Sequence, residues 1–293
     1  MTSIGRVLLI DSDEERSPTL VGQLSQNGYD SLIDDGGEGS SALIRRDRPD
    51  AILLAAALDG APGIDLARNL RREQAAAGIP IILIGEAADV GLSESDCAAA
   101  VDYFLHVPCN DAELASHLKT VLRLKTMRDE LVSRRNAMRR YGVSYDVKGI
   151  DSIDTSNPEI FLVGAQDDPL IAAAALALRD QARVTRADTP AEAVKQPASV
   201  PAELVVFPSY GAVDGCLTAY RDIRHNSRLY HLPVLLIAQP EEFEDSAEPY
   251  LAGVNDVLSS PLSGRTLRAR VTAQIKQERL RTQMSAVYRD ALR

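Results

Sequence analysis

The sequence lacks the features of a metal, redox or membrane protein. Its 3 cysteines are widely spaced without a Cys-x-x-Cys pair, and its 4 histidines show no metal-ligand spacing, so we expect no bound metal and free thiols. No segment approaches the ~20 consecutive apolar residues that a membrane span requires. The first segment, MTSIGRVLLI, lacks the basic start and cleavage site of a signal peptide. We therefore expect a cytoplasmic protein without membrane insertion.

Positive charge is also scarce. The 293 residues include 32 Lys and Arg against 42 Asp and Glu, which gives a formal net charge of −10 at pH 7. A nucleic-acid surface needs clustered cations that neutralise phosphates, so this composition argues against a nucleic-acid partner. The excess of acidic residues mainly favours solubility.

One pattern of apolar strands alternating with helices occurs twice along the chain. RVLLID is answered by EIFLVG, DAILLAA by AELVVFP, IPIILIGE by LPVLLIAQ, and VDYFLHVP by VNDVLSSP. Alternating strands and helices predict a parallel sheet covered on both faces. Five strands and five helices in ~125 residues predict a flavodoxin-like domain with strand order 2-1-3-4-5. The expected fold class is therefore α/β, with two receiver-type domains in tandem.

The length also favours two domains. We expect a first domain over residues 1–140, a linker over 141–157 and a second domain over 158–293. The segment RLKTMRDELVSRRNAMRR extends the last helix of the first domain into a helical stalk. A second long helix, LRARVTAQIKQERLRTQMSAVYRDALR, reaches residue 293 without a capping glycine. We expect this second stalk to lead to a further domain in the full protein.

Two segments resemble the tandem-receiver half of PleD-type response regulators. GVNDVLSSPLSGRTLRARVTAQI is similar to the end of their second receiver, and LRLKTMRDELVSRR is similar to their inter-receiver helix. The resemblance implies two-component signalling through cyclic di-GMP. In that family a GGDEF cyclase domain follows the second stalk, and the present sequence contains no such motif.

In the first copy the resemblance places most of a receiver's phosphorylation pocket on residues without its chemistry. A working receiver holds Mg²⁺ with an acidic pair after strand one and phosphorylates an aspartate at the end of strand three. A Ser or Thr and a Lys then bind the phosphoryl oxygens. Here Asp11 is retained, but Ser12 replaces the second acid. Ala55 stands at the acceptor, Gly85 at the Ser/Thr position and Val107 at the lysine.

The second copy is more degenerate. Gly164 and Ala165 replace the acidic pair, Pro208 stands at the acceptor, Ala238 at the Ser/Thr position and Ser260 at the lysine. Alanine and proline have no oxygen to phosphorylate. The loss of acceptor, hydroxyl and lysine in both copies indicates a fold that is kept for something other than phosphotransfer, and we expect no catalytic residues.

Two groups of charged residues leave an alternative open. Asp11, Asp13 and Glu14 form either a residual divalent-cation site or a solvated acidic loop at a helix start. Arg183 and Arg186 are candidate ligand-binding residues, since arginines of the second receiver in PleD-like proteins help to hold cyclic di-GMP. The alternative for both is a solvated surface charge. No cofactor is expected in this chain, and cyclic di-GMP would bind through the further C-terminal domain.

The resemblance also implies a docking surface. In receivers, the face of the fourth helix, fifth strand and fifth helix binds partners. Its apolar members in the first copy are either core or an exposed patch: Tyr103, Leu105, Leu114, Leu118, Val121 and Leu122.

Among PleD-type regulators, the degenerate pockets are most similar to those of PopA-like cyclic di-GMP effectors. That likeness implies a homodimer that recruits an adaptor of regulated proteolysis at the cell pole for cell-cycle control. Those effectors keep an acceptor aspartate in the first receiver, and Ala55 departs from this pattern. The alternative is a phosphorylation-dependent input module that controls an attached diguanylate cyclase.

Overall fold

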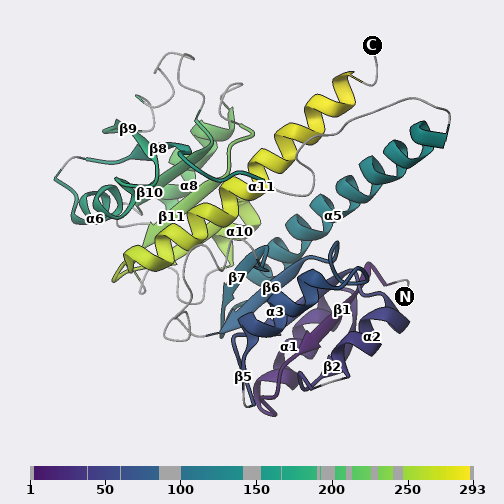
Figure 1. Cartoon of the computed structure of the whole chain (residues 1–293). Coiled ribbons are helices and arrows are strands. Elements are labelled where there is room, and N and C mark those ends of the chain that lie inside the picture. Colours follow the sequence, from purple (N-terminus) through teal and green to yellow (C-terminus); the bar gives the residue numbers. More distant parts are fainter. Residues whose placement is uncertain are drawn as a thin grey trace. The chain divides into compact units, whose positions relative to one another are not determined.

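The computed structural model describes residues 3–37, 39–59, 61–85, 100–140, 153–165, 167–189, 192, 202–208, 213–225, 230–239 and 247–290. The chain divides into two compact units (Figure 1). One comprises Met1–Asp151 with Gln283–Arg293, and the other Ser152–Thr282. Within the described part of the chain, no helix is both long and apolar enough to cross a bilayer.

The first unit alternates strands and helices as the periodicity predicts. Its elements are β1 (Gly5–Ile10), α1 (Arg16–Gln26), β2 (Tyr29–Asp34), α2 (Ser40–Asp47), β3 (Ala51–Ala55), β4 (Ala57–Leu58), β5 (Ala61–Pro62), α3 (Gly63–Arg72), β6 (Ile81–Gly85), β7 (Tyr103–His106) and α5 (Asp111–Arg140). Five strands pair in parallel in the order β2-β1-β3-β6-β7, which is the predicted 2-1-3-4-5 order. The small antiparallel hairpin β4–β5 was not predicted. The sequence also predicts a helix of small residues near Ala98, and that segment lies outside the described residues.

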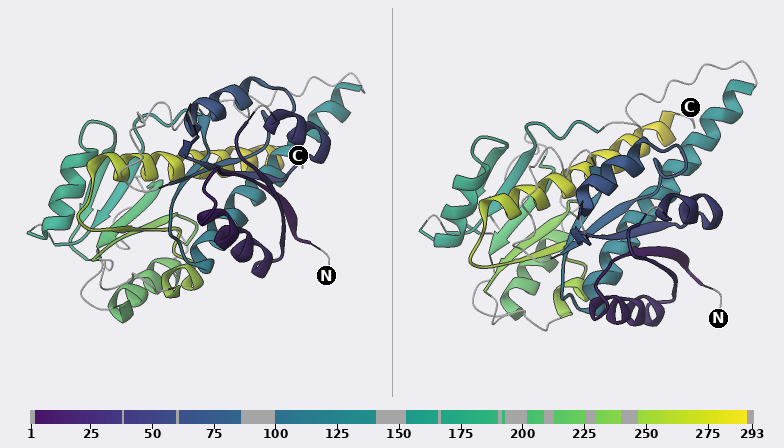
Figure 2. Two further views of the ribbon diagram at one scale, coloured as in Figure 1. Left: turned by 90° about the horizontal axis from the view of Figure 1, so that it is seen from below. Right: turned by 60° about the horizontal axis from the view of Figure 1, so that its bottom comes forward.

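The core of the first unit follows from the alternation of side chains along buried strands. Leu8 and Ile10 of β1 point to the face covered by α2 and α3, where they pack with Ile44 and Leu70. Helices lie on both faces of the sheet (Figure 2). The strands β3 and β6 are buried at every position, as expected for the middle of a doubly covered sheet.

The second unit repeats the architecture. Its elements are β8 (Glu159–Val163), α6 (Pro169–Leu178), β9 (Arg183–Ala187), β10 (Leu204–Pro208), α8 (Val213–His225), β11 (Val234–Ala238), α10 (Glu248–Ala252), β12 (Asp256–Ser259) and α11 (Gly264–Asp290). The sheet order β12-β11-β10-β8-β9 is again 2-1-3-4-5 when read from the other edge. The predicted fold class is therefore confirmed.

Each unit contains an arginine that connects a helix to the start of the fourth sheet strand, a feature that the sequence analysis did not identify. Arg71 of α3 donates to the Asp102 carboxylate and to backbone carbonyls before β6. Arg224 of α8 donates to Asn255 at 3.1 Å and to carbonyls before β11. In each unit the partner residue also accepts the backbone N–H of the first residue of the fourth sheet strand. The same connection at corresponding positions supports a duplicated unit.

Candidate functional site

The positions of the predicted phosphorylation pocket converge at one edge of the first sheet. β1, β3, β6 and β7 run in parallel register, so their carboxyl ends meet there. The structure brings together Asp11 after β1, Ala55 at the end of β3, Gly85 at the end of β6 and Val107 after β7. The Val107 N–H donates to the Gly85 carbonyl at 3.1 Å, which fixes the last two strand ends.

Asp11 is engaged by an arginine that the sequence analysis did not single out. The Asp11 side chain is 0% exposed, and Arg16 in the first turn of α1 forms a bidentate ion pair with it. Nε donates to Oδ2 at 2.8 Å and Nη2 to Oδ1 at 2.7 Å. The interpretation of Asp11 as part of a solvated acidic loop is therefore wrong, because its carboxylate is buried and ion-paired.

Asp13 arranges the start of α1. Its Oδ1 accepts the backbone N–H groups of Arg16 at 2.9 Å and of Glu15 at 3.0 Å. The bond from the Arg16 N–H, followed by that from Glu15, holds the pKa of the Asp13 carboxyl below its ordinary value. Its Oδ2 lies 3.6 Å from Arg16 Nη1. The sequence pattern predicts this helix from about Pro18. These contacts fix an earlier first turn, so α1 begins at Arg16.

Ser12 and Ala55 both contact backbone atoms at this edge. The Ser12 hydroxyl oxygen accepts the N–H of Asp59 at 3.2 Å, which ties the β1 end to the loop after β3. Ala55 is 0% exposed. Gly63 opens α3 so close to it that a Cβ on Gly63 would lie 1.8 Å from the Ala55 carbonyl oxygen. The acceptor position is thus covered by packed backbone.

The residues at this edge do not fit the Mg²⁺ ion of a working receiver. A magnesium site needs oxygen ligands with free lone pairs in near-octahedral geometry. Oδ1 of Asp11 accepts from Arg16 and from the Asp13 N–H, and Oδ2 accepts from Arg16, so a cationic guanidinium already lies against both oxygens. The Ser12 oxygen accepts from Asp59, and Ala55 supplies no side-chain oxygen. We therefore derive no phosphotransfer step through a metal.

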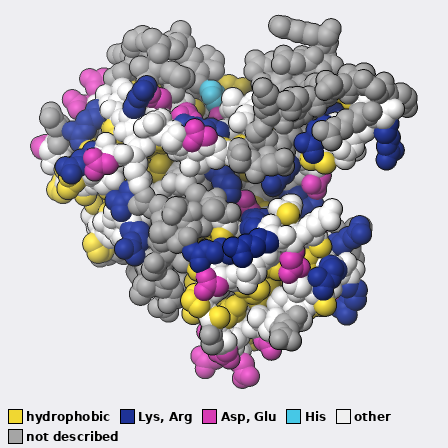
Figure 3. Space-filling model, viewed as in Figure 1, with side chains coloured by type: hydrophobic (Ala, Val, Ile, Leu, Met, Phe, Trp, Pro, Cys, Tyr) yellow, Lys and Arg dark blue, Asp and Glu magenta, His cyan; other side chains and the backbone are white. Residues whose placement is uncertain are grey.

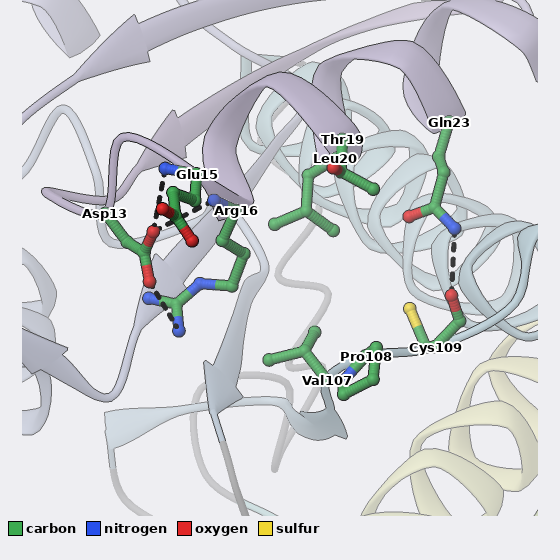
Figure 4. Close-up of a pocket in the computed structure, with 9 residues that line it drawn as sticks. All are labelled: Asp13, Glu15, Arg16, Thr19, Leu20, Gln23, Val107, Pro108 and Cys109. Atoms are coloured by element: carbon green, nitrogen blue, oxygen red, sulfur yellow. Dashed lines mark hydrogen bonds and ion pairs between the residues drawn. The ribbon is translucent and has the colours of Figure 1, made fainter.

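A pocket of about 320 Å³ lies next to this edge, between α1 and the segment after β7. Figure 4 shows Asp13 and Arg16 at one end and Gln23 and Cys109 at the other, with Val107 and Pro108 below and between them. Gln23 donates to the Cys109 carbonyl at 2.8 Å and so connects the two walls. The nine lining residues are Asp13, Glu15, Arg16, Thr19, Leu20, Gln23, Val107, Pro108 and Cys109. Arg16, the cationic residue of this lining, is already paired with Asp11. Asp13 and Glu15 add negative charge to the lining.

The second unit fills the corresponding place with hydrocarbon. A Cβ on Gly164 would lie 2.6 Å from Cγ1 of Ile171 and 3.3 Å from Cδ of Pro208. Ile171 of α6 is 0% exposed. Any acidic side chain at position 164 would therefore collide with packed apolar atoms. The Ser260 N–H donates to the Ala238 carbonyl at 2.8 Å, which repeats the bond from Val107 to Gly85 in the first unit. Neither Val107 nor Ser260 supplies a cationic side chain.

The two candidate ligand-binding arginines do not converge. Both lie on the edge strand β9, and three residues along a strand place Arg183 and Arg186 on opposite faces of the sheet. The Arg183 side chain is 75% exposed and pairs with Glu159 at 3.0 Å. An exposed pair of this kind contributes little binding energy of its own.

The expected apolar docking patch belongs to the core. Of its six residues, five are buried, and Leu122 is half-buried. The exposed positions that α5 presents nearby are polar or charged, and include Asp111, Lys119 and Arg123. On the view in Figure 3, charged side chains of both signs lie among small groups of apolar ones. An exposed patch made of these six residues is therefore excluded.

No family model matches the chain. It is 27% identical to the response regulator PleD of Caulobacter vibrioides over 275 residues, covering 94% of this chain and 60% of that protein. It is 31% identical over 121 residues to the phosphate regulon regulator PhoB of Pseudomonas aeruginosa, covering 41% of this chain and 53% of PhoB. A solved receiver domain of a modulated diguanylate cyclase from Desulfovibrio desulfuricans is 27% identical, with a TM-score of 0.39, and covers 43% of this chain and 98% of that one.

The alignment with PleD spans nearly the whole chain, and the chain spans less than two thirds of PleD. This similarity shows that the chain is homologous to the receiver domains of response regulators. The two sheets of order 2-1-3-4-5 agree with this homology, since both have the receiver-type fold.

Proposed function

We propose that the chain is a non-catalytic pair of pseudo-receivers that serves as a dimerisation and partner-recruitment platform. The observation that carries this proposal is the state of the two pockets. The acceptor positions hold Ala55 and Pro208, and the one retained acid, Asp11, is neutralised by Arg16. No group remains to accept a phosphoryl group at either acceptor position. We therefore infer that the two units act by binding other proteins through their surfaces.

The likeness to PleD supports a place in cyclic di-GMP signalling. A PopA-like role would have the homodimer recruit an adaptor of regulated proteolysis, in the cytoplasm at the cell pole, for cell-cycle control. Any cyclic di-GMP would need ligands beyond Arg183 and Arg186, because these two side chains lie on opposite faces of β9. The isologous contact of a homodimer would present each surface twice.

A second candidate is a phosphorylation-dependent input module for an attached diguanylate cyclase. The response-regulator relatives favour it, since receivers of this class usually switch on phosphorylation. Val107 at the lysine position and Gly85 at the hydroxyl position oppose it, because neither side chain can bind phosphoryl oxygens.

Light scattering over a concentration series tests the platform. We expect a dimer whose population grows with protein concentration. Charge reversal at exposed positions of α5, in Asp111→Lys, Lys119→Glu and Arg123→Glu, is expected to reduce partner recovery in a pull-down several-fold. Arg72→Glu, an exposed reversal on α3, is the matched control and should leave recovery unchanged. A monomer at every concentration, with recovery unaffected by all reversals, would contradict the proposal.

A further inference from the structure

The guanidinium of Arg16 lies between two carboxylates at the end of β1. It forms two hydrogen bonds with Asp11 at 2.7 and 2.8 Å, and Nη1 is 3.6 Å from Oδ2 of Asp13. The Asp11 side chain is completely buried, whereas Arg16 is 25% exposed. Arg16 therefore covers the buried carboxylate on its solvent side. Figure 4 shows the guanidinium reaching across toward Asp13 at the end of the pocket.

This arrangement performs the structural work of a bound divalent ion. Such an ion offsets the charge of converging carboxylates and fixes the loop that carries them. A buried carboxylate without a partner is strongly disfavoured, and a planar guanidinium fork matches both carboxylate oxygens at once. The backbone bonds that Asp13 accepts from the N–H groups of Glu15 and Arg16 fix the turn from which the Arg16 side chain reaches back.

We propose that Arg16 is a tethered replacement for the divalent ion of a receiver pocket. The β1–α1 loop then holds one conformation at any concentration of divalent ions. The inference deepens the proposed function, and it rests on the assignment of this edge as a disused receiver pocket. It implies a latent site: without the Arg16 charge, Asp11 and Asp13 are free to bind a divalent ion weakly.

Thermal unfolding of the full chain in EDTA and in millimolar Mg²⁺ tests this proposal. The wild type is expected to have the same Tm in both. Arg16→Met is expected to melt several degrees lower in EDTA and to regain part of that loss in Mg²⁺. Asp11→Asn combined with Arg16→Met removes the buried charge, so Mg²⁺ should restore nothing. Arg6→Met, which removes an exposed cation from β1, is the matched control and should respond to neither condition.

Mn²⁺ gives a local readout. In Arg16→Met it is expected to broaden the NMR signals of the Asp13 and Glu15 amides, and in the wild type to leave them sharp. Equal broadening in both proteins would overturn the proposal, because Arg16 would then not exclude the ion. A lower Tm without recovery in Mg²⁺ would also overturn it, leaving an ordinary ion pair. Either failure differs from that of the proposed function, which concerns dimer formation and partner recovery.

Discussion

Replacing Asp256 by alanine is expected to lower the free energy of unfolding of the second unit by about 3–5 kcal/mol. Asp256 on β12 is 0% exposed, and Arg270 on α11 is 3% exposed, with 3.3 Å between Nη1 and Oδ2. Removing the carboxylate leaves a guanidinium charge in a medium of low dielectric constant. Corresponding positions in the first unit hold Tyr103 and His117, whose rings stack with centroids 4.1 Å apart. A stacked aromatic pair therefore fits this place.

Chemical denaturation followed by circular dichroism, with hydrogen exchange to identify the second unit, measures this loss. Asp180→Ala is the matched control, because that carboxylate is 82% exposed and pairs with Arg179 at the surface at 3.2 Å. Its expected cost is under about 1 kcal/mol. Removing both charges, in Asp256→Leu with Arg270→Met, is expected to cost less than Asp256→Ala alone. Equal costs for Asp256→Ala and Asp180→Ala would contradict the account.

Gly63→Ala is expected to destabilise the first unit by at least about 3 kcal/mol. The added methyl group would lie 1.8 Å from the Ala55 carbonyl oxygen and 3.0 Å from its carbonyl carbon. Both are backbone atoms of a fully buried strand, so neither can move aside without disturbing the sheet. The Gly63 N–H also donates to the Ala56 carbonyl at 2.8 Å, which holds the start of α3 against the strand end.

Gly22→Ala provides the control for Gly63→Ala. Gly22 lies within α1, and nothing comes within 4 Å of a Cβ built there. The same substitution should stabilise the helix by up to about 1 kcal/mol, because alanine has the higher helix propensity. Urea midpoints of both variants give the comparison. A Gly63→Ala protein as stable as Gly22→Ala would show that α3 does not press on the acceptor strand.

The sequence predicts the sheets because burial on both faces leaves a continuous apolar signal in each central strand. It also predicts where the pocket positions meet, since strand ends in a parallel sheet share one edge. Arg16 could not be assigned from periodicity, because its role depends on a side chain reaching back five residues to a buried acid. A cation shortly after a lone retained aspartate is the signal that could have pointed to it.

Other features depend on side-chain directions and close contacts. The sequence shows that Gly164 stands where a receiver has an acidic residue. Only the packing shows that Ile171 occupies the space of that side chain. Arg183 and Arg186 are near each other in the sequence and on opposite faces of a strand. For the apolar residues of the docking face, a helical or strand period cannot distinguish core from exposed patch, and the fold assigns them to the core.

Intact-mass measurement after incubation with acetyl phosphate and Mg²⁺ tests the central claim most directly. A receiver that keeps its acidic pair and acceptor aspartate must gain a phosphoryl group under the same conditions. The present chain is predicted to keep its mass, because neither Ala55 nor Pro208 offers an oxygen and Asp11 is already bound by Arg16. A phosphoryl adduct located on either unit by peptide mapping would contradict the pseudo-receiver account.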